Sequence, residues 1–507
     1  MKTNGINLNS IDYFSSQLPF LSEFQSSKSW FTQSEKTWNT NNEDSLDLDS
    51  DGWVKSLPSP GEASYSTAGT LLFTGHDSYL SGNYVVLYEG EGEIEYNLDA
   101  TKNEALSSPG RDVIEVDPSE DGIALSITET DPDGTGDYIR DIQVVHEDFE
   151  SNANAKTFNP EFLNKIQPFN TFRFMDWMET NNSQQKEWAD RPKLEDARYS
   201  EIGAPVEIMV ELANQTNTDP WFTMPHLATD EYVENFASYV KQNLKSDLKV
   251  YVEYSNEVWN NNFEQANWVD KQAQQEWSNS DLNGEDWYSK RTTEVVEIWD
   301  DVFSNSEKVI GVMAAQSANV EAGERLLDYN WSNDSLSHDD TGIDAIAINA
   351  YFGRYIGEPS NEAELKSWLN ESDGGLNNLF KEINEGGLLS NSPEGGALAG
   401  ATDNIKAYVD LAEAENLPLL AYEGGQHLAP MGNLKSDRGI VDLFIEANSD
   451  SRMGKIYEDY VSDWYSLGGD QFLNYSDIDT PSESGSWGLL DSVYQDNSPK
   501  YNAVVNG

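Results

Sequence analysis

Hydrophobic and polar positions follow two different patterns along this 507-residue chain, one before about residue 150 and one after residue 160. In the first part, short runs rich in β-branched and aromatic residues are separated by Gly, Pro, Asp and Ser. The runs lie at Thr70–Phe73, Tyr84–Tyr88, Ile94–Tyr96, Asp112–Val116, Ile123–Ile127 and Ile139–Val145. Short strand-like runs at this spacing are typical of an all-β unit. The pattern therefore predicts a small β-sandwich module over residues 59–147.

After residue 160, short apolar runs alternate with longer amphipathic stretches. The runs lie at Thr171–Trp177, Trp221–His226, Lys249–Tyr254, Lys308–Ala314, Ala345–Tyr351, Pro418–Tyr422 and Gln471–Tyr475. Between two of these runs, Tyr232, Phe236 and Val240 recur at helical spacing after Thr229, a residue type that often begins helices. Strands that alternate with helices in this way indicate a parallel β/α architecture.

An eighth strand at Gly5–Asn9, ahead of the β-rich part, would complete a (β/α)8 barrel. The sequence then predicts a first barrel strand with an acidic loop over residues 1–58, the β-sandwich over 59–147, and the remainder of the barrel over 148–507. The module would be an insertion between the first and second barrel strands. An open doubly wound sheet is the alternative, but no glycine-rich dinucleotide fingerprint follows any of the strands.

Composition and charge narrow the range of functions. The chain has 31 Lys and Arg against 90 Asp and Glu, and its net charge of −59 would repel nucleic acids and anionic membranes. It has no Cys, which excludes a disulfide, a thiol nucleophile and a thiolate metal site. No apolar run is long enough to span a membrane, and no signal-peptide core follows Met1. We expect a monomer, located outside the cell or in the periplasm after removal of a leader, with a cytoplasmic location as the alternative.

Polar side chains follow the predicted strands, at the end where the catalytic groups of barrel enzymes lie. They are Arg173, Asp176, His226, Asn256, Glu257, Asn349, Tyr351, Glu423 and His427. Two of them, Glu257 and Glu423, are glutamates that follow different strands. Glycoside hydrolysis needs one carboxyl group that protonates the leaving oxygen and a second that acts as nucleophile or base. The pair is therefore sufficient for that chemistry.

The motifs around the two glutamates resemble a known group of enzymes. Ser255-Asn256-Glu257 after the fourth strand and Tyr422-Glu423-Gly424 after the seventh are similar to the large clan of retaining (β/α)8 glycoside hydrolases that includes family 5 cellulases and mannanases. The resemblance covers roughly residues 165–490. It implies that Glu257 is the acid/base and Glu423 the nucleophile of a double displacement. No closer family is assigned.

The same resemblance extends to supporting positions. Family 5 has Arg after strand two, His near strand three, Tyr after strand six and Trp after strand eight, and the matching residues are Arg173, His226, Tyr351 and Trp487. Physically, Arg173 can keep Glu423 ionised, and Tyr351 can donate a hydrogen bond to it. Asn256 can hold the sugar 2-hydroxyl, and Trp487 can present an apolar face to a pyranose ring.

One position departs from the family pattern, and one acidic residue competes with the chosen pair. Family 5 commonly has His-x-Tyr after strand six, where this chain has Asn349 two residues before Tyr351. This difference leaves close family membership and sugar preference open. Glu253 lies on the same side of its strand as Glu257, because side chains alternate along a strand. We expect Glu253 to be buried and paired with Arg173.

Several candidates near the motifs have two interpretations. His226 and His427 either contact substrate or take part in a layer of hydrogen-bonded polar groups. Asp176 holds either Arg173 or a sugar hydroxyl group. The rings of Trp259 and Trp487 are candidate sugar-binding platforms, since aromatic faces in a cleft can pack against pyranose rings.

An acidic loop precedes the β-rich part. Asp47, Asp49 and Asp51 alternate with other residues before Gly52, which is the oxygen-ligand spacing of a calcium loop, but the twelfth position is Pro58 rather than Glu. We therefore expect no cofactor in the chemistry and leave a structural calcium ion at this loop as an option.

Together these features predict a retaining glycoside hydrolase that cleaves a β-linked polysaccharide of glucan, mannan or xylan type, and that is endo-acting. The alternative from another class is a non-catalytic carbohydrate-binding protein on a degenerate glycosidase barrel. The presence of both carboxylates favours the enzyme.

Overall fold

The computed structural model describes residues 3–59, 61–153, 155–278, 281–304, 307–332 and 334–506. Within them, eight parallel strands close into one barrel. In barrel order the strands are β1 (Thr3–Asn7), β12 (Thr171–Arg173), β13 (Asp219–Met224), β14 (Val250–Tyr254), β15 (Val309–Ala315), β16 (Ile343–Phe352), β17 (Leu419–Gln426) and β18 (Gln471–Asn474). The predicted barrel is confirmed, and its closure excludes the doubly wound sheet.

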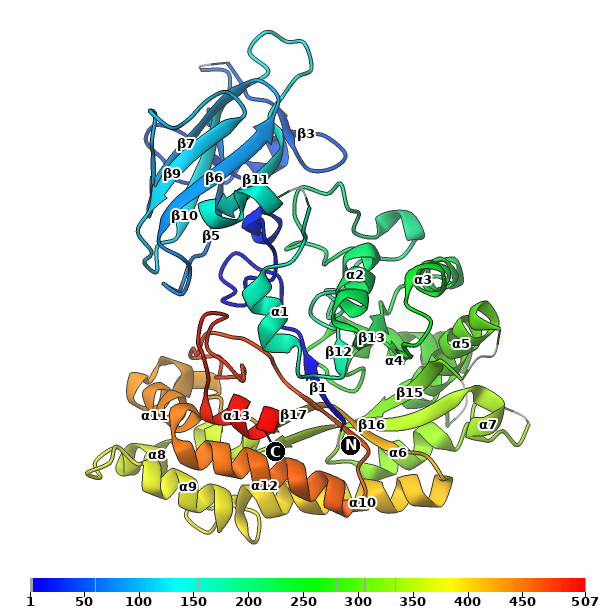
Figure 1. The fold of residues 1–507 in the computed structure, drawn as a ribbon. Helices are drawn as coiled ribbons and strands as arrows, with labels where there is room; N and C mark the ends of the chain where they lie inside the picture. Colours follow the sequence, from blue (N-terminus) through cyan, green and yellow to red (C-terminus); the bar gives the residue numbers. More distant parts are fainter. Residues whose placement is uncertain are drawn as a thin grey trace.

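The first strand closes the barrel. Ile6 of β1 is in register with Phe172 of β12, and Gly5 is in register with Leu473 of β18. Because β12 follows β1 in the barrel but begins only at residue 171, the whole segment between them is an insertion between neighbouring strands (Figure 1).

Helices surround the barrel (Figure 1). They are α1 (Pro160–Ile166), α2 (Val206–Thr216), α3 (Asp230–Asn243), α4 (Glu264–Glu276), α5 (Gly284–Phe303), α6 (Val320–Leu327), α7 (His338–Thr341), α8 (Glu362–Trp368), α9 (Leu376–Asn384), α10 (Gly396–Glu415), α11 (Arg438–Ser449), α12 (Ser451–Leu467) and α13 (Pro499–Asn506). In α3, the Thr229 side chain caps the first turn by accepting from the Tyr232 amide, and the predicted apolar stripe is buried. In the described part of the chain, no helix combines the length and the apolar character that crossing a membrane requires.

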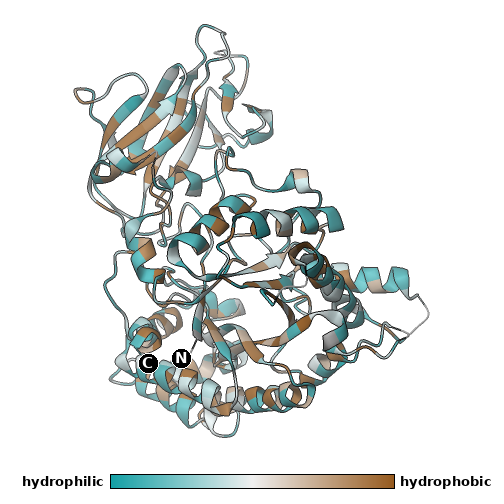
Figure 2. Ribbon diagram, turned by 45° about the vertical axis from the view of Figure 1, so that its right-hand side comes forward, coloured by the Kyte–Doolittle hydropathy of each residue, from teal (hydrophilic) through white to brown (hydrophobic). Residues whose placement is uncertain are grey.

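The insertion contains two four-stranded antiparallel sheets. One has the order β2 (Phe31–Gln33), β5 (Thr67–Leu72), β10 (Ile123–Thr130), β7 (Gly92–Leu98), and the other β11 (Arg140–His146), β6 (Gly82–Glu89), β9 (Arg111–Val116), β8 (Ala100–Lys102). Along β7, buried side chains alternate with more exposed ones. Figure 2 shows both hydrophobic and hydrophilic residues on the strands of these sheets. Strand β2 lies before residue 59 and joins the first sheet by pairing with β5. The domain boundaries and the sandwich arrangement stay predictions.

Buried aromatic rings connect the insertion to the barrel. Phe20 contacts Trp177 and Tyr199, with ring centroids 5.9 and 5.7 Å apart. Phe24 stacks on Trp53 at 5.4 Å. All five side chains belong to one buried cluster that continues into both parts of the chain. Apolar burial therefore holds the two parts together.

The acidic loop, an optional calcium site in the sequence, forms a short hairpin whose carboxylates contact the protein itself. It lies around the hairpin of β3 (Asp47–Leu48) and β4 (Val54–Ser56). Asp47 pairs with Lys55 at 2.7 Å, while Asp49 accepts from the Asp51 amide at 2.9 Å and from the Tyr138 hydroxyl at 2.7 Å. Among the described residues, no group of three or more His, Cys, Asp or Glu could hold a metal ion. The described structure therefore does not support a calcium ion here, because donors from the protein engage oxygens of Asp47 and Asp49.

Candidate active site

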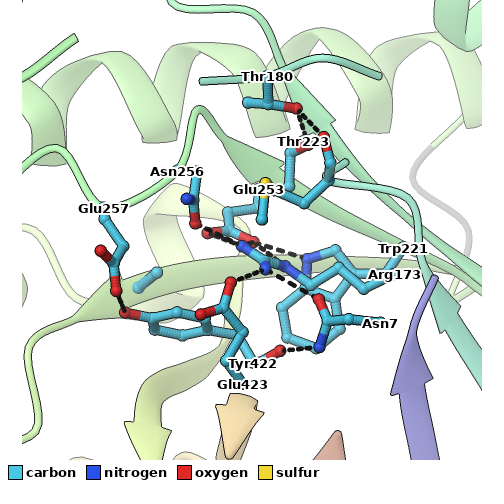
Figure 3. Close-up of polar contacts among 12 residues, drawn as sticks. Asn7, Arg173, Thr180, Trp221, Thr223, Glu253, Asn256, Glu257, Tyr422 and Glu423 are labelled. Carbon is cyan, nitrogen blue, oxygen red and sulfur yellow. Dashed lines mark hydrogen bonds and ion pairs between the residues drawn. The ribbon is translucent and has the colours of Figure 1, made fainter. Parts of the chain in front are cut away.

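Arg173, the last residue of β12, is fully buried where the carboxyl ends of the barrel strands meet (Figure 3). Its Nε and Nη2 donate to the two carboxylate oxygens of Glu253, at 3.0 and 3.1 Å. Its Nη1 donates to Asn7 at 3.1 Å and to Glu423 at 2.7 Å, and Nη2 also donates to Asn256 at 2.9 Å. These contacts engage all five N–H groups of the guanidinium.

The carboxylates around Arg173 stabilise its protonated form. Burial alone would lower the pKa of Arg173, but the negative charges of Glu253 and Glu423 outweigh this effect and raise the pKa above its ordinary value. The guanidinium also lies 4.9 Å from the centroid of the Tyr422 ring, close enough for a cation–π contact. Arg173 is therefore a permanent cation whose donors are fully occupied within the protein.

Glu253 belongs to the interior of the barrel. Its side chain is almost completely buried, and one oxygen also accepts from the Trp221 indole at 2.9 Å. Burial raises its pKa, and the charge and hydrogen bonds of Arg173 oppose that effect. Because Glu253 is enclosed by protein, it cannot reach a substrate.

Glu423, within β17, is held at both carboxylate oxygens. Oε1 accepts from Arg173, and Oε2 accepts from the Tyr351 hydroxyl at 3.0 Å. Burial and the charge of Glu423 raise the pKa of Tyr351 well above its usual value, so the phenol keeps the proton that it donates. The orientation of the Glu423 carboxylate is thus fixed by two donors from different strands.

Glu257, three residues beyond the end of β14, is partly exposed. Its Oε2 accepts from Asn260 at 2.9 Å, and its Oε1 receives long hydrogen bonds of 3.4 Å from Tyr422 and Asn349. Burial, followed by the charge of Glu423, raises the pKa of Glu257 to about 8. At neutral pH this carboxyl group is therefore mainly protonated.

The backbone around Glu257 is in an uncommon conformation. Ser255 and Glu257 have φ angles of 61° and 41°, in the left-handed region that residues other than glycine rarely adopt. Between them, Asn256 is fixed at both ends of its amide, because Oδ1 accepts from Arg173 and Nδ2 donates to Asn181 at 3.0 Å. Such local strain, held in place by the surrounding contacts, is common at functional sites.

Four aromatic side chains, those of Tyr351, His427, Tyr475 and Trp487, form an aromatic wall on one side of the site. Trp487, partly exposed, meets His427, Tyr475 and Tyr351 edge to face, with ring centroids 4.9, 5.9 and 6.0 Å away. Burial lowers the pKa of His427 to about 4, so its ring is neutral at neutral pH. The wall thus combines apolar ring surface with hydroxyl and imidazole groups.

Three residues predicted from the sequence take no part in the hydrogen bonds around Glu257 and Glu423 in the described structure. His226 packs against Trp268, with centroids 6.0 Å apart, and within the described part of the chain no hydrogen bond connects it to Glu257 or Glu423. Trp259 lines a neighbouring pocket of about 300 Å³ at the ends of β14 and β15. Asp176 has Tyr475 as its hydrogen-bond partner and makes no hydrogen bond to Arg173 among the described residues.

Several residues of the site were not selected from the sequence. They are Asn7, Tyr422, Asn260 and Tyr475. Asn7 and Tyr475 stand at or just after the carboxyl ends of the first and last barrel strands, and Tyr422 precedes Glu423. A polar residue at the end of an otherwise apolar run was the available signal for Asn7 and Tyr475. Asn260 lies in a loop and carried no such signal.

No model of a protein family matches the sequence, and no curated protein matches it. Solved structures of barrel glycoside hydrolases are similar to it at low sequence identity, without assigning it to a family. A broad-specificity endoglucanase from Clostridium acetobutylicum is 12% identical, with a TM-score of 0.38, covering 70% of this chain and 92% of its own.

Two further neighbours come from fungi. A 4-O-α-L-rhamnosyl-β-D-glucuronidase from Fusarium oxysporum is 10% identical, with a TM-score of 0.39 and coverage of 68% of this chain and 64% of its own. Fungal β-1,4-galactanases are 9% identical, with a TM-score of 0.37 and coverage of 69% and 91%. Similarity at this level assigns no activity to this chain.

Proposed function

We propose that the protein is a retaining glycoside hydrolase that cleaves a β-linked polysaccharide by double displacement. The observation that carries this proposal is the contrast between two glutamates that follow different strands of one barrel. Glu257 keeps a proton at neutral pH because burial and the charge of Glu423 raise its pKa to about 8. Glu423 is held at both oxygens by Arg173 and Tyr351. Two carboxyl groups whose environments differ in this way suit an acid and a nucleophile.

In the first step, a carboxylate oxygen of Glu423 attacks the anomeric carbon of the sugar. The glycosidic C–O bond breaks, and Glu257 transfers its proton to the leaving oxygen. The products are a free sugar end and a glycosyl ester on Glu423. Arg173 and Tyr351 hold the attacking carboxylate in place during this step.

In the second step, Glu257 acts as a base. Formation of the ester removes the negative charge of Glu423, which is the second-largest cause of the raised pKa of Glu257. The ionised Glu257 then accepts a proton from water as the water oxygen attacks the anomeric carbon and the ester bond to Glu423 breaks. Two displacements on the same carbon return the product to the configuration of the substrate.

The surroundings of the pair support an extended substrate. Val258 and Trp259, which directly follow Glu257, line the pocket of about 300 Å³ at the ends of β14 and β15, a volume within the usual range for ligand sites. This pocket can receive a sugar unit on the leaving-group side, and the face of Trp487 can pack against a unit elsewhere in the cleft. We therefore propose endo action on a glucan, mannan or xylan, with no cofactor in the chemistry.

The inserted sheets and the surface charge fit the same proposal. We propose that the two four-stranded sheets form a sandwich that shapes the cleft or binds carbohydrate. A net charge of −59 supports solubility in a saline setting. We also propose that the enzyme is a monomer that acts outside the cell or in the periplasm.

A reducing-sugar assay across a panel of β-glucans, mannans, xylans and galactans tests the function. The wild-type protein should release reducing ends from at least one polymer, as a ladder of oligosaccharides. Glu257→Gln and Glu423→Gln should lower that rate by about 10²–10⁴-fold or more, the usual range for loss of such a group. Glu371→Gln, an exposed carboxylate after α8, is the matched control and should retain activity. Binding of a polymer without cleavage by the wild type would favour the non-catalytic carbohydrate-binding protein instead.

A further inference from the structure

Two buried side chains donate to one carbonyl group beside Trp487. Lys500 Nζ donates to the carbonyl oxygen of Ser486 at 2.7 Å, and Gln426 Nε2 donates to the same oxygen at 2.8 Å. All three residues are buried, and Lys500 is only 2% exposed. The carbonyl belongs to the peptide bond that links Ser486 to Trp487, so the two hydrogen bonds fix the plane of that peptide. This plane sets the direction in which the indole leaves the backbone.

The two donors come from distant parts of the chain. Gln426 is the last residue of β17, the strand of the proposed nucleophile, and it directly precedes His427 of the aromatic wall. The amide of Gln426 is fixed at both ends, because its Oε1 accepts from the Leu428 backbone at 2.6 Å. Lys500 lies in the first turn of the last helix, α13. The Ser486 carbonyl therefore joins the end of β17 to α13.

The indole of Trp487 also rests on the backbone that precedes it. Its Nε1 donates to the carbonyl of Ser484 at 3.1 Å. Gly485 has a φ angle of 135°, and a Cβ atom there would lie 2.6 Å from atoms of the indole, so this position suits only glycine. Contacts with the other three side chains of the aromatic wall complete its surroundings. The orientation of the ring thus depends on the backbone from Ser484 to Trp487.

Lys500 is an unfavourable residue for its position. Burial lowers its pKa to about 8, and the charges of Asp491 and Asp479 oppose that effect, so the ammonium group is mainly protonated at pH 7. A cation in the first turn of a helix also opposes the helix dipole. Neither feature favours folding, and such local conflicts are expected at functional sites. Neither step of the proposed mechanism uses Lys500.

We propose that Lys500 is a positioning residue for substrate binding, which fixes the peptide before Trp487 and thereby sets the angle at which the indole meets a sugar ring. A charged donor makes a stronger hydrogen bond than a neutral amide, so Lys500 contributes more to this restraint than Gln426. Because Lys500 is buried, it acts through Trp487 and not by contact with the sugar. The inference rests on the proposed function, in which Trp487 packs against a sugar unit.

Fluorine NMR of the protein labelled with 5-fluorotryptophan tests the positioning without ligand or turnover. The signal of Trp487 is assigned by its loss in Trp487→Phe. At pH 7, Lys500→Met should shift or broaden this signal, because the peptide before the indole is released, while Lys500→Arg keeps a charged donor and should stay closer to the wild type. Should Lys500→Met not fold, Gln426→Met removes the second donor to the same carbonyl and should move the same signal.

The matched control is a second buried residue of α13. Val504 is 3% exposed and makes no hydrogen bond to Ser486 in the described structure. Val504→Ala leaves a cavity in the same helix and should lower the melting temperature. It should not move the Trp487 signal, since the hydrogen bonds to the Ser486 carbonyl remain.

A double-mutant cycle on ligand affinity shows whether Lys500 acts through Trp487. Calorimetry on the Glu257→Gln background uses cellotetraose, mannotetraose and xylotetraose. Lys500→Met should weaken the binding of at least one tetramer by about 3- to 10-fold, as expected for the loss of one hydrogen bond, and Trp487→Ala should weaken it at least as much. In the Trp487→Ala background, Lys500→Met should have no further effect.

Three results would overturn the proposal: a Trp487 signal that neither Lys500→Met nor Gln426→Met moves, losses of affinity that add up in the double variant, or no binding of any tetramer. Failure of the proposed function has a different signature. Tetramer binding that depends on Lys500 through Trp487, with no cleavage of any polymer by the wild type, would reject the hydrolase and leave the positioning role in place.

Discussion

The Nη1 atom of Arg173 lies 2.7 Å from Oε1 of Glu423, and the two side chains come from strands β12 and β17, which are not neighbours in the barrel. The ion pair therefore crosses the interior of the barrel. The same guanidinium is bound to both oxygens of Glu253, so one buried cation compensates two carboxyl groups. Stability and the proposed chemistry thus depend on the same residue.

Replacement of Arg173 by Met should destabilise the fold strongly. The change leaves Glu253 and Glu423 buried without their cation, and breaking such a pair costs ~3–5 kcal/mol of unfolding free energy. Urea denaturation at pH 7 measures this loss. Arg438→Met is the control, because Arg438 is exposed and pairs with Asp442 on one helix, where the expected cost is below ~1 kcal/mol. A loss for Arg173→Met as small as that of the control would contradict the role of the buried ion pair.

The pH dependence of activity should have its alkaline limit near the pKa of Glu257. The acid must be protonated for the first step, and its pKa of about 8 lies above the ordinary value for Glu, so kcat/KM should fall as the pH rises through about 8. Because the charge of Glu423 contributes to this shift, Glu423→Gln should lower the pKa of Glu257. NMR titration of labelled glutamate side chains, assigned with Glu257→Gln, measures the change. A pKa of Glu257 that stays the same in Glu423→Gln would show that the two groups do not interact.

The barrel could be predicted from the sequence because each of its strands is indicated by a pattern of neighbouring residues. Each strand is a short apolar run, and the run Lys249–Tyr254 corresponds to β14 within one residue. The two glutamates could also be selected, because they follow different predicted strands and together supply the two carboxyl groups that glycoside hydrolysis needs. Closure of the barrel is not local, and it brings Asn7 of the first strand to Arg173 of the second. No periodicity along the chain encodes that contact.

The role of Asp176 and the state of the acidic loop could not be predicted, because each depends on contacts with residues far away in the sequence. The two interpretations of Asp176 depend on whether Arg173 has a free donor, and that follows only from the complete set of its partners. The spacing Asp47, Asp49, Asp51 is compatible with a calcium loop and also with a hairpin whose carboxylates accept from donors of the protein itself. Spacing alone does not distinguish the two, because both use the same oxygen atoms.

Azide should rescue the variant Glu257→Ala. Without its acid, this variant should keep the first step on aryl glycosides with good leaving groups, which need little protonation, and stall at the glycosyl ester for lack of a base. Azide needs no base, so it should restore turnover and give a β-glycosyl azide, identified by NMR. The matched control is Glu423→Ala, in which azide can attack only the opposite face and should give the α-glycosyl azide. An α product from Glu257→Ala would reverse the assignment of the two glutamates.

The covalent intermediate on Glu423 is the central claim, and trapping it is the most direct test. A 2,4-dinitrophenyl 2-deoxy-2-fluoro-β-glycoside of the sugar identified in the polymer panel should react once and then hydrolyse slowly, because fluorine destabilises both transition states while the good leaving group favours the first step. Mass spectrometry of the intact protein should show the addition of one fluoroglycosyl group, and peptide mapping should place it on Glu423, with no label on Glu423→Gln. Labelling of another carboxylate, or the absence of any label from an enzyme whose early products have the inverted configuration, would contradict the account.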